Sequence, residues 1–169
     1  DVNVIALEAV EFDKAVDLSP EGPWGQRIAL LKRSLALGVE GRLKDVEGEV
    51  VAALPLDPGA HKRRGVRPPP RLTEPPETAR IDRARAYLTF MHEIRGAAER
   101  LGYGATWTKT SEHVQSRLDT YIEDLLDILR APEESNDLER VRQFLAIAAE
   151  FMGLATDDKV AQIVRRRAA

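Results

Sequence analysis

Residues 81–101 read IDRARAYLTFMHEIRGAAERL, and apolar residues recur in this stretch at intervals of three and four. An α-helix turns by about 100° per residue, so residues at these intervals lie on one face. The apolar face predicts a helix that begins at Glu77 or Thr78, ends near Leu101 and packs against a core. Its members are Ile81, Ala84, Tyr87, Leu88, Phe90, Met91, Ile94, Ala98 and Leu101.

The stretch that begins at Trp24 has the same spacing. Its apolar residues predict one long helix, or two helices joined near Gly38 or Gly41, with a stripe that faces the core. The members of this stripe are Trp24, Ile28, Leu31, Leu35, Val39, Leu43, Val46 and Val50.

Two more helices are predicted toward the C-terminus by their apolar spacing and their capping residues. The first is expected to begin at Thr110 or Ser111 and to end before Pro132, and the second to begin at Ser135-Asn136-Asp137 and to close at Gly153. Thr156 can cap a last short helix. We therefore expect an all-α fold, an antiparallel helical bundle of four or more helices.

Proline content divides the chain into three parts. Residues 55–76 hold seven of the ten prolines together with several arginines, which predicts a basic linker or a long excursion. Residues 1–54 form an N-terminal segment that is mostly helical from residue 24, and residues 77–169 form the helical body. Residues 2–12 fit a strand or an apolar arm that packs on the bundle.

Composition excludes several classes of function. With 25 basic and 28 acidic residues the net charge is −3, which gives no general case for nucleic-acid binding. Cysteine is absent, which excludes disulfide bonds, thiolate nucleophiles and zinc–thiolate sites. The sequence contains neither an apolar run of about 18 residues nor a signal-peptide pattern, so we expect a cytoplasmic protein that does not use a membrane.

Four acidic residues crowd the helix that ends before Pro132, but no histidine is paired with them. A metal site needs ligands that converge, so we interpret this cluster as a solvated face and expect no metal. Its members are Asp119, Glu123, Asp124 and Asp127.

His92 lies just outside the apolar face of the helix at 81–101, on its solvated flank. An exposed imidazole with a pKa of about 6.5 can be neutral and accept a phosphoryl group. Arg95 can bind phosphoryl oxygens, and Gly96 leaves space beside the ring at a helix-propensity cost of about 1 kcal/mol. Arg85 adds a second cation.

The motif His-x-Ile-Arg-Gly-x-Ala-x-x-Leu-Gly at residues 92–102 resembles that of histidine phosphotransfer (HPt) domains. The resemblance implies a helical bundle in which an exposed histidine relays a phosphoryl group between aspartates of receiver domains. His92 would be the phosphoacceptor, Arg95 its cation and Gly96 the clearance residue. Met91 departs from the small residue common before the histidine.

The resemblance also implies a phosphorelay intermediate rather than an autonomous enzyme, with no cofactor of its own. Its partner would be a receiver domain of a response regulator or of a hybrid kinase. The surface that faces this partner would include Arg85, Leu88, Thr89 and Glu99.

The helical stripes leave other functions open. One alternative is a non-catalytic helical interaction or scaffold module, including a degenerate HPt-like fold, and this alternative predicts an exposed apolar patch. A third is binding to an anionic surface through the basic residues at 62–71 and 165–167, which should weaken steeply with salt.

Overall fold

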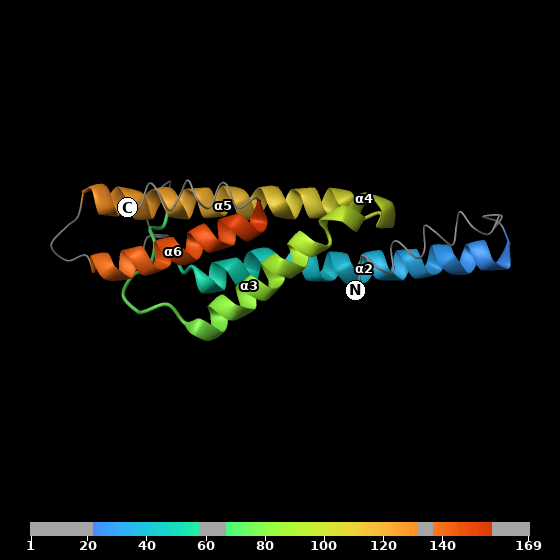
Figure 1. Ribbon diagram of the computed structural model, residues 1–169, viewed down its shortest axis with the longest axis horizontal. Helices are drawn as coiled ribbons and strands as arrows, with labels where there is room; N and C mark the ends of the chain where they lie inside the picture. Colours follow the sequence, from blue (N-terminus) through green and yellow to red (C-terminus); the bar gives the residue numbers. More distant parts are fainter. Residues whose placement is uncertain (1–21, 58–66, 132–136, 157–169) are drawn as a thin grey trace.

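Four long helices build the part of the chain that the structure, a computed structural model, describes: residues 22–57, 67–131 and 137–156 (Figure 1). The prediction of an all-α helical bundle is confirmed. The only extended pairing in these ranges is a single antiparallel bridge between Leu56 and Pro70. The helices are α2 (Pro23–Ala53), α3 (Thr78–Glu93), α5 (Gly104–Arg130) and α6 (Leu138–Ala155), with the short η2 (Arg95–Ala97) and α4 (Ala98–Leu101) before α5.

The long helices form two antiparallel hairpins, α2 with α3 and α5 with α6 (Figure 1). The hairpins lie side by side, because α2 also packs on α5 and α3 also packs on α6. Figure 1 shows that helices in contact between the hairpins run in the same direction, whereas consecutive helices are antiparallel. None of the described helices is long and apolar enough to cross a bilayer.

The core lies where the four helices meet, and it is almost entirely aliphatic apart from a few aromatic rings. Tyr103, Phe144 and Phe151 are its largest fully buried side chains, each no more than 1% exposed. Ala84 of α3 and Ala148 of α6 are fully buried, and these two helices pack against each other. Burying a side chain of Leu, Val or Phe size contributes about 1.5–3 kcal/mol, so this core supplies most of the stability.

The N-terminal half of α2 projects beyond the rest of the bundle (Figure 1). We call residues 23–38 the α2 arm, because Val39 is the first buried side chain of the helix. Four large apolar side chains of the arm are 60–69% exposed: Trp24, Leu30, Leu31 and Leu37. The predicted core stripe is correct from Leu35, which packs half-buried against the core, and wrong for Trp24 and Leu31, which stay exposed.

The helix predicted to run to Leu101 ends earlier, at Glu93. Ile94 closes α3, a 3-10 turn follows, and α4 continues in a new direction to a left-handed Gly102 (φ 83°). Gly96 weakens the helix here. The fully buried Tyr103 fixes the break, because its hydroxyl donates a hydrogen bond of 2.9 Å to the Ile94 carbonyl.

The limits of α5 and α6 differ in part from those predicted. α5 begins at Gly104 rather than at Thr110 or Ser111, and Ser111 is buried inside the helix. The predicted start of α6 is confirmed, since the Asp137 side chain accepts a hydrogen bond from the Arg140 amide. Gly153 lies within α6 rather than closing it. Residues 2–12, the residues after Thr156 for which a short helix is predicted, and the basic residues at 165–167 lie outside the described residues.

Both ends of the proline-rich segment are held against the bundle. Backbone hydrogen bonds join Asp57 to Pro69 and Arg71 to Pro55, at 2.8 and 2.9 Å. Arg140 of α6 donates to the Leu72 carbonyl at 2.8 Å. The described ends of the segment are therefore parts of the fold; residues 58–66 lie outside the described ranges.

Candidate functional site

Three places in the described part of the chain are candidates for a functional site. They are the exposed surface around His92, a groove between α2 and α5, and the α2 arm.

His92 is exposed in the last turn of α3, one residue before the helix ends. The break that follows carries Arg95 and Gly96 into the 3-10 turn, so they do not continue the helical face on which His92 stands. Both are exposed, and a methyl group added at Gly96 would meet no atom within 4 Å. The surface around His92 is therefore open to a partner.

Arg95 has an aromatic contact next to the histidine. Its guanidinium carbon lies 5.5 Å from the centroid of the Trp107 ring, within the range of a cation–π interaction. The Trp107 indole donates a hydrogen bond of 2.8 Å to the Met91 carbonyl, which ties this pair to the end of α3. Arg95 is therefore engaged by the Trp107 ring.

Arg85 does not serve as a second cation for His92. Its Nε atom lies 2.5 Å from Glu150 of α6, and it also pairs with Asp82. The hydrogen bond to Glu150 raises the pKa of Arg85 above its ordinary value. This side chain holds α3 to α6 instead.

The other residues predicted to face a receiver are scattered by the fold. Leu88 is fully buried, so its prediction as a partner contact is wrong: it belongs to the core stripe of α3. Thr89 is half-buried. Glu99 is exposed on α4, where its carboxylate fills the space that a side chain at Gly104 would need.

The end of a helix also matters electrostatically. The C-terminus of a helix carries a partial negative charge, and a nearby cation gains about 0.3–1 kcal/mol there. A phosphoryl anion on His92 would instead be repelled by this partial negative charge. The end of α3 therefore gives no electrostatic stabilisation to a phosphoryl anion on His92.

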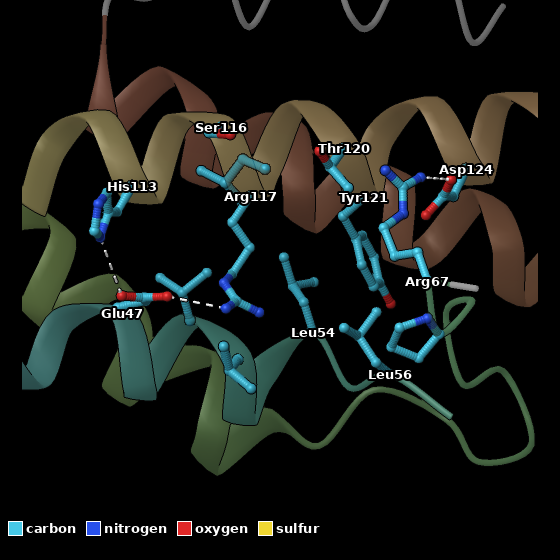
Figure 2. A pocket seen from close by; sticks show the side chains of 14 residues that line it. Glu47, Leu54, Leu56, Arg67, His113, Ser116, Arg117, Thr120, Tyr121 and Asp124 are labelled. Atoms are coloured by element: carbon cyan, nitrogen blue, oxygen red, sulfur yellow. Dashed lines mark hydrogen bonds and ion pairs between the residues drawn. The ribbon is translucent and has the colours of Figure 1, made fainter. Parts of the chain in front are cut away.

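The groove between α2 and α5 has a volume of about 460 Å³ (Figure 2). Its floor is apolar, formed by Val50, Leu54 and Leu118 among others. Figure 2 shows Glu47 of α2 reaching toward α5, where its carboxylate accepts a hydrogen bond from Arg117 at 2.9 Å and lies 3.7 Å from the His113 ring.

At the other end of the groove Arg67 forms an ion pair with Asp124 (Figure 2). The Tyr121 hydroxyl is buried and has no hydrogen-bond partner among the described residues. Burial, and then the charge of Asp124, raises the pKa of Tyr121, so the hydroxyl stays protonated.

The groove resembles a packing interface between two helices more than a catalytic or metal site. Its two arginines are each paired with a carboxylate, so its charges balance. Nucleophilic catalysis by Ser116 would need a hydrogen bond from its hydroxyl to a base such as His113. Within the described residues no such hydrogen bond is present. Nor do three potential metal ligands converge anywhere in the ranges that the structure describes.

The α2 arm carries its exposed apolar residues on two sides of the helix. At about 100° per residue, Trp24 and Leu31 share one side, and Leu30 and Leu37 lie roughly a third of a turn away. Arg27 stands between the two pairs and stacks 5.8 Å from the Trp24 ring centroid. Exposed apolar residues concentrated in one projecting helix are typical of an interaction surface.

Comparisons of the chain with protein-family models, with curated proteins and with solved structures gave no match.

One feature of the sequence indicates that the arm has a second contact surface in addition to the predicted core stripe. Leu30 and Leu37 are large apolar residues off the core stripe, and they recur seven residues apart. Leucines outside the main stripe of a helix indicate a second contact surface. The Trp107 contact has no comparable signal, because it depends on the break between α3 and α5.

Proposed function

We propose that the protein is a helical interaction module that uses the α2 arm to dock a partner protein. The observation that carries this proposal is the exposure of Trp24, Leu30, Leu31 and Leu37 on a helix that extends beyond its own core. An exposed Leu that becomes buried in an interface contributes about 1–2 kcal/mol, so a few such residues are enough for a specific complex.

The arm suits a protein better than a lipid bilayer. A helix that lies in a membrane interface buries a single apolar face and keeps the opposite face polar. On the arm, Arg27 and Ser34 separate two apolar sides. The apolar interior of a bilayer could therefore not bury both sides at once. The arm carries three cations and no carboxylate between residues 23 and 39, which favours a partner helix with acidic residues.

The test is capture of a partner from the source cells by the full chain, followed by loss of that partner in an arm variant. Leu30→Glu with Leu37→Glu is expected to weaken binding by about 30- to 100-fold, since two leucines lose their apolar contact and negative charge enters the interface. Both side chains lie outside the core, so the thermal unfolding midpoint should stay unchanged.

The matched control is Ala86→Glu with Ala146→Glu, which adds the same charges at exposed positions of α3 and α6. The control is expected to bind like the wild type. Equal losses in both variants would remove the arm from the interface. Binding to anionic vesicles with no protein captured would replace a protein partner with a membrane.

A second candidate is phosphotransfer through His92. Two observations favour it: His92 and Arg95 are both exposed, and the space beside Gly96 is open. The end of α3 at Glu93 and the pairing of Arg85 with Glu150 count against it, which makes it second to the interaction module.

Phosphorylated receiver domains of response regulators or hybrid kinases provide the test for this second function. If His92 accepts phosphate, acid-labile label should appear on the full chain and vanish completely in His92→Gln, while the circular dichroism spectrum stays the same. His113→Gln is the control, because His113 is exposed on α5 and lies outside the motif. Label that persists in His92→Gln would exclude this histidine as the acceptor.

A further inference from the structure

One side of the α2 arm has the spacing of a coiled-coil seam. Trp24, Ile28, Leu31 and Leu35 follow one another at intervals of four, three and four residues. Trp24 and Leu31 are more than half exposed, and Ile28 and Leu35 are half-buried. A second helix laid along this seam would cover all four.

The chain has a second seam with the same spacing just before the arm. Residues 2–16, which lie outside the described ranges, carry apolar residues at intervals of three, four, three and four. As helices, residues 2–16 and the α2 arm would each be about 22–24 Å long, at 1.5 Å per residue. The members of this seam are Val2, Ile5, Ala9, Phe12 and Val16.

The two seams match in register when the chain reverses between them. Ser19-Pro20-Glu21-Gly22 provides the break, because proline and glycine end helices and favour turns. A reversal there brings four of the five residues of this seam opposite the four seam residues of the arm, in the alternating layers of an antiparallel coiled coil. The opposing residues are Val16 and Trp24, Phe12 and Ile28, Ala9 and Leu31, and Ile5 and Leu35.

Charge distinguishes this occupant from a second copy of the arm. Residues 1–17 contain five carboxylates and one lysine, whereas residues 23–39 contain three cations and no carboxylate. Pairing the two stretches brings opposite charges together. Pairing the arm with another arm would bring cations against cations, which is unfavourable.

We infer that residues 2–16 of the chain itself pack antiparallel on the Trp24 side of the α2 arm. The side with Leu30 and Leu37 stays open in this arrangement, because it lies roughly a third of a turn away. A partner helix with acidic residues would then compete with the chain's own segment for the Trp24 side. The competition rests on the proposed function; the contact itself does not.

The contact can be measured without any partner. The chain has no cysteine, so Asn3→Cys with Ser34→Cys gives a single pair of spin labels on the full chain. Packing as inferred predicts a narrow distance distribution at roughly 15–25 Å, since packed helix axes lie about 8–10 Å apart. Phe12→Asp, placed in the seam, should abolish this peak. Lys14→Asp, on the opposite side of the segment, should keep it.

Dilution of the labelled chain with unlabelled chain identifies the source of the segment. A peak that survives a tenfold excess of unlabelled chain supports packing within one chain. A peak that disappears on dilution would overturn the inference, because the segment would then come from a second copy. A broad distribution beyond about 35 Å, the span expected of two helices that point apart, would overturn it as well. Neither result depends on whether a partner protein is captured.

Discussion

Tyr103→Ala is expected to lower the free energy of unfolding by about 3–5 kcal/mol, the range found when a large buried aromatic side chain is truncated. Tyr103 is fully buried between the end of α3 and the start of α5, and its hydroxyl holds the Ile94 carbonyl. The substitution removes both the packing and this hydrogen bond. Chemical denaturation followed by circular dichroism measures the change.

Tyr103→Phe separates the two contributions. It keeps the ring and removes only the hydroxyl, while the Ile94 carbonyl still accepts a hydrogen bond from the Ala97 amide at 3.1 Å. The expected loss is about 0.5–1.5 kcal/mol. If Tyr103→Ala cost no more than Tyr103→Phe, the ring would not be a core side chain and the account of the helix break would be wrong.

Ser34→Pro is expected to melt the α2 arm while the bundle stays folded. Proline removes a backbone hydrogen bond and clashes with the preceding turn, which costs about 3 kcal/mol or more inside a helix. Residues 23–33 would then be too short to stay helical alone, since isolated helices under about 12–15 residues are marginal in water. Hydrogen exchange should become fast in the arm and stay slow from Val39 onward.

Val46→Pro is the matched control in the other half of α2. Val46 is fully buried in the bundle, so the same change there should unfold the whole chain. The contrast follows from the first buried residue of α2 being Val39. A fall in the global unfolding midpoint of equal size for both variants would show that the arm is an integral part of the core.

The helical fold follows from the sequence because apolar spacing is a local property of each segment. The stripes around Leu43, Leu88, Leu118 and Leu145 each identify a helix and its buried face. The spacing of apolar residues along one helix does not indicate how far the neighbouring helices extend. The stripe from Trp24 therefore continues past the point where the other helices end, and the sequence alone does not separate arm from core.

The surroundings of His92 depend on contacts between distant residues. Helical spacing places Arg85, Arg95 and Gly96 beside the histidine only if one helix runs through them all. The break after Glu93 depends on Tyr103, ten residues further on, and the position of Arg85 depends on Glu150 of α6. Local propensity indicates a weak point at Gly96 and nothing about those partners.

The central claim is that the α2 arm binds a partner protein, and calorimetric titration of the captured partner tests it most directly. The titration compares wild type, Leu30→Glu with Leu37→Glu, and the control Ala86→Glu with Ala146→Glu. We expect a Kd about 30- to 100-fold weaker for the arm variant and an unchanged Kd for the control. An arm variant that binds as tightly as wild type would contradict the claim.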